Sequence, residues 1–368
     1  MADWFTINNI EEIDTPALVV YPERVVQNIR NAINMIDDVW RLRPHVKTNK
    51  TLEATELMLQ AGITKFKCAT IAEAEMLGMA QAPDVLLAYQ PQGPKILRLI
   101  ALIKKYSATR YSCLADNAES ANNLSNAALQ NKIVLPVFID VNVGMNRTGI
   151  EPDQCLKLYK HCASLPGINL VGLHAYDGHL HQPDFKVRSQ VCNEAFSKVE
   201  ELAANISKAG LANPIIVAGG SPTFPIHAKR KQIECSPGTF IFWDKGYELT
   251  CAEQPFVPAV LVISRIISQP NTTTICLDLG HKSIASESEL HKRVYFLNAP
   301  DFVFKGHSEE HLVVSVPEGH TYKIGDVFYG VPYHICPTVA LYDSALIANE
   351  HMCKGEWKII ARDRKITI

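Results

Sequence analysis

The sequence predicts an α/β protein in two parts, a (β/α)8 barrel of the TIM type followed by a C-terminal, mostly β domain. Strand-like and helix-like runs alternate through the first two-thirds of the chain, which favours parallel strands joined by crossover helices. Nine strand-like runs precede residue 245; if the first is an outer lead-in strand, eight remain, the number that a closed barrel needs. An open doubly wound sheet is the competing architecture, but the glycine-rich first turn typical of it is missing from Thr48-Asn49-Lys50.

The barrel elements follow from the hydrophobic pattern in chain order. Pro22 suits the first turn of a helix, because its missing N–H would have no partner there in any case. The expected helices cover residues 22–36, 51–60, 71–80, 94–106, 117–130 and 184–208. The expected strands are short runs rich in β-branched residues, at 16–21, 40–47, 65–70, 85–90, 109–115, 135–142, 168–176, 214–219 and 232–240.

The chain changes character after about residue 250, where few helical stretches remain and glycine and proline mark the turns. Strands are expected at 257–268, 273–279, 311–316, 326–331 and 357–362. We therefore place the barrel at residues 13–248 and the β domain at residues 249–368, with residues 1–12 added to it.

Composition and charge exclude several classes of protein. The 368 residues are 47% hydrophobic and 20% charged, which excludes disorder along the whole chain. A formal charge of −2 leaves no basic excess for a phosphate backbone, so we expect no nucleic-acid partner. The chain has no run of about 18 apolar residues for a membrane span and no secretion signal at its N-terminus. The ten scattered cysteines favour a cytoplasmic protein with mostly buried thiols.

Lys47 ends the expected strand 40–47 and is a candidate nucleophile. Catalytic groups of a barrel gather at the C-terminal ends of its strands and in the loops that follow. A lysine at such a position can be partly desolvated, which lowers its pKa and makes its amine nucleophilic. A solvated surface lysine is the alternative, which the polar run of residues 43–48 makes weaker.

Two further strand ends carry candidate groups. Arg147 lies between Gly144 and Gly149, where its fork of donors suits a phenolate or a carboxylate; capping a helix or pairing with a surface acid is an equally good interpretation. Histidine is a common base or metal ligand, although a single buried histidine is more often only hydrogen-bonded. Three histidines and a tyrosine fall within eight positions at the end of the strand 168–176: His174, Tyr176, His179 and His181.

Two glycine-containing turns lie at the ends of the last two expected barrel strands. TIM barrels often hold a phosphate in these two loops, because glycine lets backbone amides approach an anion. A plain turn is the alternative for either segment alone. The candidate phosphate ligands are Gly219, Gly220, Ser221, Gly238 and Thr239.

In the second domain, His334 and Cys336 are two positions apart. On an extended strand both side chains would point to one side. Imidazole and thiolate suit Zn²⁺, and two protein ligands would leave positions open for water or substrate. A chance pair on a core strand is the alternative.

Taken together, these residues resemble those of the D-threonine aldolase and D-serine dehydratase group within the alanine-racemase-like pyridoxal-phosphate (PLP) enzymes. The resemblance covers nearly the whole chain, from residue 14 to the final strands, and its most specific segments are residues 43–48, 140–149 and 334–338. It implies a PLP-binding barrel, a β domain, a small D-amino-acid substrate and a homodimer.

The resemblance also implies roles for single residues. Lys47 would hold PLP through its aldehyde, Arg147 would sit near the phenolic oxygen, and Tyr176 would line the ring face. The five candidate phosphate ligands match the family's phosphate cup, and His334 with Cys336 matches its pair of ligands for a divalent metal, Zn²⁺ or Mn²⁺. His181 matches a histidine that the aldolases place as base for the substrate's β-hydroxyl.

The activity that the resemblance implies is a lyase for D-β-hydroxy-amino acids. His181 favours aldol cleavage to glycine and an aldehyde, as in D-threonine aldolases. Cys336 stands where many aldolases have an aspartate, which favours the alternative, a D-serine dehydratase giving pyruvate and ammonia. An amino-acid racemase and a non-catalytic PLP-binding protein are further alternatives.

Overall fold

The computed structural model describes residues 3–368, in two compact units. The barrel unit comprises Arg30–Lys47, Thr55–Gly238 and Asp363–Ile368. The β unit comprises the chain up to Ile29, Thr48–Ala54 and Thr239–Arg362. Residues 1 and 2 of the expected β domain lie outside the described residues.

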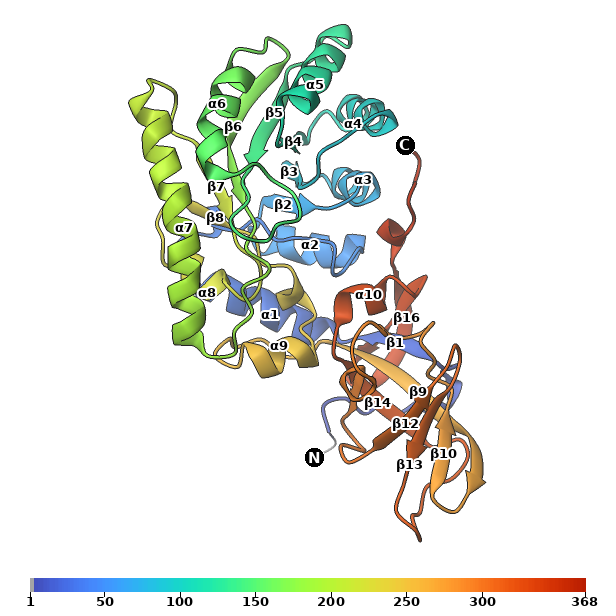
Figure 1. The fold of residues 1–368 in the computed structure, drawn as a ribbon. Coiled ribbons are helices and arrows are strands. Elements are labelled where there is room, and N and C mark those ends of the chain that lie inside the picture. Colours follow the sequence, from blue (N-terminus) through green and yellow to red (C-terminus); the bar gives the residue numbers. More distant parts are fainter. Residues whose placement is uncertain (1–2) are drawn as a thin grey trace. The chain divides into compact units, whose positions relative to one another are not determined.

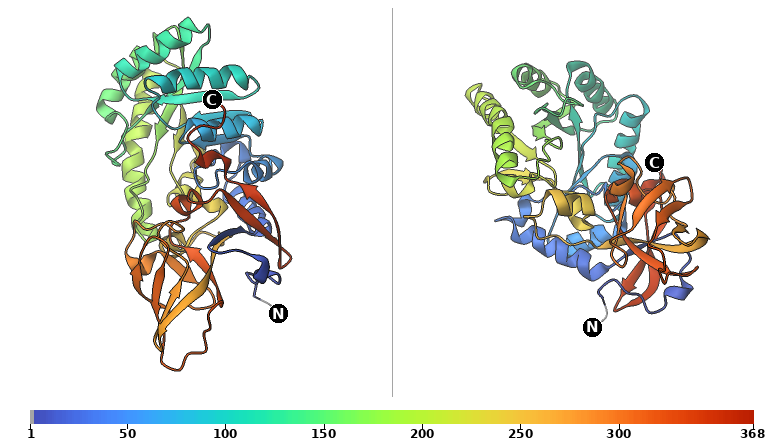
Figure 2. Two further views of the ribbon diagram at one scale, coloured as in Figure 1. Left: turned by 90° about the vertical axis from the view of Figure 1, so that its right-hand side faces the viewer. Right: turned by 60° about the horizontal axis from the view of Figure 1, so that its bottom comes forward.

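The barrel unit contains a seven-stranded parallel sheet in sequential order, as the alternating pattern predicts. Helices lie on the outside of these strands (Figures 1 and 2). The strands are β2 (Lys65–Cys68), β3 (Asp84–Leu87), β4 (Arg110–Ala115), β5 (Leu135–Asp140), β6 (Ile168–Ala175), β7 (Ile215–Ala218) and β8 (Ile233–Cys235). The helices are α1 (Pro22–Asn34) and α2 (Leu52–Gln60), which both begin in the β unit, and α3 (Ile71–Met79), α4 (Pro94–Lys105), α5 (Ala118–Gln130), α6 (Pro152–Ala163), α7 (Phe185–Lys208) and α8 (Phe224–His227).

The eighth position of the barrel is taken by the segment 42–46. Leu42 forms a parallel bridge with Cys235 of β8, and His45 forms one with Lys67 of β2, so the segment joins the two edges of the sheet. It is not the continuous strand 40–47 that we expected, because Pro44 has no N–H to donate to a ladder. The predicted closed α/β barrel is confirmed, with this edge made of isolated bridges.

The β unit is built on a mixed sheet of nine strands. The first strand-like run of the sequence becomes β1 (Ala17–Val20) and lies outside the barrel, as expected; it pairs antiparallel with β9 (Val260–Asn271) and parallel with β15 (Ser344–Asn349). The other strands are β10 (Thr274–Leu277), β11 (Val294–Phe296), β12 (Val303–His307), β13 (Leu312–Ser315), β14 (Val327–Pro332) and β16 (Met352–Lys358).

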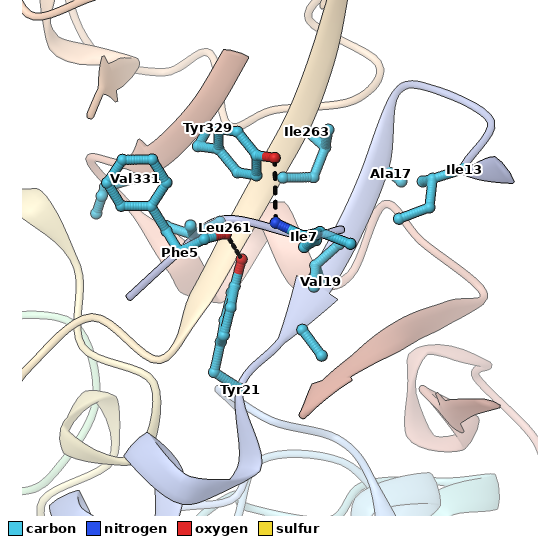
Figure 3. Packing of buried hydrophobic residues seen from close by; sticks show 11 residues of the cluster. Phe5, Ile7, Ile13, Ala17, Val19, Tyr21, Leu261, Ile263, Tyr329 and Val331 are labelled. Carbon is cyan, nitrogen blue, oxygen red and sulfur yellow. Dashed lines mark hydrogen bonds between the residues drawn. The ribbon is translucent and has the colours of Figure 1, made fainter. Parts of the chain in front are cut away.

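A hydrophobic cluster around Tyr21 and Tyr329 holds the N-terminal segment on this sheet (Figure 3). The Tyr21 hydroxyl donates to the carbonyl of Phe5 at 2.7 Å, and the amide of Ile7 donates to the Tyr329 hydroxyl at 3.4 Å. Both buried phenols therefore keep a hydrogen-bond partner, as buried polar groups must.

Several elements differ from the expected set: β11, β12 and β15 were not expected, and β16 ends at Lys358, where a strand over 357–362 was expected. Helix α6 was not among the expected helices, although Pro152 stands in its first turn and its buried residues recur at helical spacing: Cys155, Leu158, Tyr159 and Cys162. The short helix α10 (Ile335–Val339) replaces the expected strand around the His334 and Cys336 pair. None of the helices within residues 3–368 combines the length and hydropathy of a membrane span.

Candidate active site

A cavity of about 400 Å³ lies in the barrel unit among the C-terminal ends of its strands. This volume is in the range of small-molecule sites in proteins. Several of the side chains that line it contain nitrogen. The lining residues are His45, Lys47, Lys67, Ala69, Ala88, Tyr89, Gln90, Arg147, Thr148, His174 and Tyr176.

Three of the predicted site residues meet in this cavity. Lys47 follows the closing segment of the barrel, in a turn, and its Nζ lies 5.8 Å from the centre of the Tyr176 ring. The guanidinium carbon of Arg147 lies 5.3 Å from the same ring centre. Tyr176 comes directly after β6, and Arg147 lies in the loop between β5 and α6. The barrel topology therefore gathers residues that are more than 100 positions apart in the chain.

His174 and Asp140 form a buried pair beside this ring. His174 Nδ1 lies 2.7 Å from Asp140 Oδ1, and Asp140 Oδ2 accepts from Gln90 Nε2 at 2.9 Å. Burial opposes charge on Asp140, but its hydrogen bonds, first the one with His174 and then those with Thr148 and Gln90, hold the pKa of this carboxyl below its usual value. Burial lowers the pKa of His174. His174 Nε2 is buried and has no hydrogen-bond partner among the described residues, so a neutral imidazole offers a free acceptor to whatever fills the cavity.

The predicted anion-binding turn follows β7. Gly219 has φ +79°, and a Cβ there would lie 2.7 Å from the His227 ring, so this position requires glycine. The amide of Gly238 donates to Ser221 Oγ at 3.2 Å, which brings the two predicted turns together. Thr239 falls in the β unit, where its Oγ1 lies 3.8 Å from Cys336 Sγ.

A buried network that the sequence does not predict supports this turn. Asp177 accepts hydrogen bonds from Thr223 Oγ1 and His227 Nε2, both at 2.8 Å. Thr223 Oγ1 in turn accepts from the amide of Gly220 at 3.2 Å. Burial opposes charge on Asp177, but the hydrogen bond from His227 holds the pKa of this carboxyl below its usual value. No local signal marks these residues, because their contacts span up to 50 positions.

His181 lies outside the group of residues that line the cavity. It is exposed in the loop between β6 and α7. His179, two positions earlier, faces the loop that carries Arg147: a Cβ on Gly144 would lie 3.0 Å from His179 Nε2. The histidine cluster of the sequence therefore divides into a buried His174 and two loop histidines.

The predicted metal pair lies in the β unit, in a different local structure from the one expected. His334 is the N-cap of α10, and Cys336 is the second residue of that helix, so they do not alternate along a strand. The strand β14 stops at Pro332, and the helix begins immediately afterwards. His334 nevertheless hydrogen-bonds Cys336, so the pair is together.

The surroundings of this pair are polar. His334 Nδ1 forms a short hydrogen bond with Glu287 Oε1, and Cys336 Sγ lies 3.1 Å from Thr48 Oγ1. Burial disfavours a charged His334, but contact with Cys336 and Glu287 raises its pKa to about 9. A metal ion bound there would have to displace this proton and that of the thiol. Imidazole nitrogen and thiolate sulfur are ligands that fit Zn²⁺.

Among residues 3–368, three ligand atoms of metal-binding types lie within 4.8 Å of one another at one place, Asp177, Cys192 and His227. Arg230 Nη1 lies 3.0 Å from His227 Nδ1, so Nδ1 accepts and Nε2 carries the proton that it donates to Asp177. This imidazole therefore has no free lone pair for a metal, and we interpret the group as the support of the glycine turn.

The residues of the cavity fit an aldehyde cofactor that carries a phosphate. A lysine amine suits the aldehyde, and the free nitrogen of His174 and the guanidinium of Arg147 suit polar ring substituents. The turn at Gly219-Gly220-Ser221, with Gly238 beside Ser221 Oγ, is the candidate place for a phosphate, because glycine lets an anion come close to the backbone; the amides of Gly219, Gly220 and Gly238 hydrogen-bond within the protein.

Comparison with known proteins adds independent evidence. The chain is 28% identical to the D-threonine aldolase of Arthrobacter sp over 361 residues, covering 96% of this chain and 94% of that protein. It is 22% identical to the D-threo-3-hydroxyaspartate dehydratase of Delftia sp. (strain HT23), covering 90% of this chain and 93% of that one. Its fold matches the crystal structure of D-threonine aldolase from Filomicrobium marinum with a TM-score of 0.88 at 23% identity, over 95% and 96% of the two chains.

Two family descriptions match the sequence. A serine dehydratase domain matches residues 259–348, within the β unit. The alanine racemase N-terminal domain matches residues 20–245, which is more than half of the chain. The chain therefore belongs to the alanine racemase N-terminal domain family.

Proposed function

We propose that this protein is a PLP- and divalent-metal-dependent lyase that cleaves D-β-hydroxy-amino acids to glycine and an aldehyde, as D-threonine aldolases do. The observation that carries the proposal is the gathering of Lys47, Arg147 and Tyr176 around one cavity. The relatives named D-threonine aldolase and D-threo-3-hydroxyaspartate dehydratase support the substrate class.

The residues of the barrel unit would hold the cofactor. Lys47 is the amine for its aldehyde, Arg147 the partner of its phenolic oxygen, and Tyr176 the side chain against its ring. PLP, when bound, supplies an electron sink for the bond that breaks at the substrate's α-carbon. The phosphate ligands are Gly219, Gly220, Ser221, Gly238 and Thr239.

The β unit would hold the metal. His334 and Cys336 are two ligands for a divalent cation, and sulfur favours Zn²⁺ over the harder Mn²⁺. A cation there supplies Lewis acidity for the substrate's β-oxygen. Glu287 holds His334 Nδ1, which fixes the orientation of the imidazole.

The histidine that removes the β-hydroxyl proton decides the outcome of the reaction. We assign this role to His181 by its match to the aldolases; its place in an exposed loop leaves its ring free to approach a bound substrate. His179 in the same loop is the natural comparison, because its Nδ1 is buried and lacks a partner among the described residues.

The second candidate is a dehydratase that gives a keto acid and ammonia. Cys336 favours it, because many aldolases have aspartate at this position. Lys47 would then remove the α-proton, and the β-hydroxyl would leave. In either case we expect a soluble substrate and a homodimer.

Product analysis tests the proposal. The purified protein is incubated with PLP and Zn²⁺ or Mn²⁺, separately with D-threonine and D-serine. Glycine with acetaldehyde supports the aldolase, keto acid with ammonia supports the dehydratase, and the L-enantiomer of either substrate would indicate a racemase. His181→Ala should remove aldol cleavage and leave the colour of the bound cofactor unchanged, whereas His179→Ala should keep most of the cleavage.

A further inference from the structure

Lys67 is a buried lysine of the cavity to which the proposed function gives no role. It is the third residue of β2, and only 2% of it is exposed. Its amide donates to the carbonyl of Pro44 at 2.8 Å, so the backbone of the closing segment fixes its position. Its Nζ lies 5.3 Å from the centre of the Tyr176 ring, as close as the guanidinium carbon of Arg147.

The Lys67 amine has no hydrogen-bond or ion-pair partner among the described residues; Lys67 lines the cavity, with its Nζ near the Tyr176 ring. The acids around it are used elsewhere: Asp140 by His174 and Gln90, and Asp177 by His227 and Thr223. A lysine is almost never fully buried without a partner, because the charged amine loses its hydration. Such a residue costs stability and is expected where a ligand supplies the missing partner.

The charges that face Lys67 show what kind of ligand this is. Burial first and the nearby Lys47 second lower the pKa of Lys67 from 10.5 to about 7, and Arg43 adds to this; Asp177 and Asp140 act in the opposite direction. The other titratable groups that line the cavity are Arg147, the neutral His174, His45, Tyr89 and Tyr176. The cavity therefore has an excess of potential positive charge, which suits an anion.

The position of Lys67 indicates which anionic group of the cofactor or substrate it would bind. The phosphate has its own site in the turn at Gly219-Gly220-Ser221, and Arg147 is the partner of the phenolic oxygen. The remaining anion is the α-carboxylate of the amino acid, which must lie beside the cofactor's aldehyde and hence beside the amine of Lys47. We propose that Lys67 binds the α-carboxylate of the substrate. This inference rests on the proposed function.

Comparison with the neighbouring Lys65 shows that a lysine on this strand can have an acidic partner, which Lys67 lacks within the described part of the chain. Lys65 projects from the same face of β2, one step toward the start of the strand, and it forms a close ion pair with Glu234. The strand thus carries one lysine that the protein pairs and one that it leaves for a ligand. Lys65→Met is therefore the matched control.

The test compares an amino acid with the same amine lacking its carboxylate. D-Alanine and ethylamine are titrated into PLP-loaded wild-type protein, Lys67→Met, Lys67→Arg and Lys65→Met, and binding is followed by the absorbance of the cofactor. A charge-assisted hydrogen bond supports an about 10- to 100-fold effect. We expect Lys67→Met to weaken the binding of D-alanine by this factor and to change the affinity for ethylamine by less than about threefold. Lys67→Arg should recover part of the lost affinity for D-alanine.

Proton uptake gives a second measurement that does not depend on turnover. Because the carboxylate would raise the pKa of Lys67, D-alanine binding at pH 8 should take up about one more proton in wild type than in Lys67→Met; the protons that the D-alanine ammonium group loses on forming its Schiff base are common to both proteins and cancel in the difference. Calorimetry in two buffers of different ionisation enthalpy measures this. The unfolding temperature of Lys67→Met, expected to be at or above that of wild type, shows that the variant is folded.

Two results would overturn the inference. One is equal binding of D-alanine by wild type and Lys67→Met. The other is an equal loss for D-alanine and ethylamine, which would mean that the substitution only changes the shape of the cavity. A wild-type protein that forms no coloured complex with PLP would contradict the proposed function itself, so the two failures are distinguishable.

Discussion

Among its described residues, the barrel unit contains two layers of charged side chains, one in which the charges are paired and one in which the lysines have no acidic partner. Near the starts of the strands, Arg43 is 2% exposed and bonds Glu234 at 2.7 Å and Asp84 at 2.6 Å, while Lys65 pairs with Glu234. Near the ends of the strands, Lys47 and Lys67 face one cavity with no ion pair to an acid among residues 3–368.

The difference separates stability from chemistry. The Arg43 layer is closed, meaning that each of its charges has an opposite charge within bonding distance. The ion pairs of Arg43 account for its place in the polar run of residues 43–48. The cavity layer is left incomplete, as expected at the catalytic end of a barrel. Substitutions in the closed layer and around the cavity test this difference.

The largest effect is expected from Arg43→Met. The substitution removes the shared cation of the buried Glu234 carboxylate and the partly exposed Asp84 carboxylate, and removing one partner of a buried ion pair costs about 3–5 kcal/mol. Urea unfolding followed by circular dichroism measures this. A loss below about 1 kcal/mol would show that the closed layer does not stabilise the barrel.

Asp177→Asn is expected to cost about 1–3 kcal/mol of stability, because the amide offers one acceptor where Thr223 and His227 need two. The turn at Gly220 should then become less well held, and the affinity for PLP should fall about tenfold. Pyridoxal, which lacks the phosphate, is the control and should bind with unchanged affinity. Equal losses for both compounds would contradict a role through the phosphate turn.

Lys67→Met is expected to stabilise the protein by about 1–2 kcal/mol at pH 7, because it removes a buried amine without a partner. In wild type the unfolded chain binds more protons than the folded one from about pH 7 up to 10.5, so the stability of wild type rises with pH across this window. The advantage of the variant should therefore shrink as the pH increases. An advantage that is constant from pH 6 to pH 9 would mean that Lys67 does not titrate there.

The smallest effect is expected from Lys65→Met, about 1 kcal/mol or less. Lys65 is partly exposed, and Glu234 keeps its bond to Arg43 when Lys65 is removed. Thermal unfolding is a sufficient measurement. A loss as large as that of Arg43→Met would show that the ion pairs act as one indivisible unit.

The sequence is sufficient to predict the seven strands β2 to β8 of the barrel and most of its helices, because these elements show their own periodicity, but helix α6 was missed. It also identifies Lys47, Arg147 and Tyr176, since they lie at strand ends that the topology must bring together. The change from strand to helix at His334 could not be predicted, because the segment 335–339 is short and apolar in either form.

Lys67 and the Asp177 network could not be predicted for different reasons. In Lys65-Phe66-Lys67 the hydrophobic residue would be expected to face the core and the lysines the solvent, but a barrel strand is covered on both faces, and all of Phe66 is buried under the outer helices. Which polar residues share the interior depends on contacts between distant strands, which periodicity does not report.

The central claim is that Lys47 holds an aldehyde cofactor in this cavity, and chemical trapping tests it most directly. The PLP-loaded protein is reduced with borohydride, digested, and mapped by mass spectrometry. The account predicts a single pyridoxyl label on Lys47 that disappears in Lys47→Ala. A label on Lys67 or on surface lysines instead, or none at all, would contradict it.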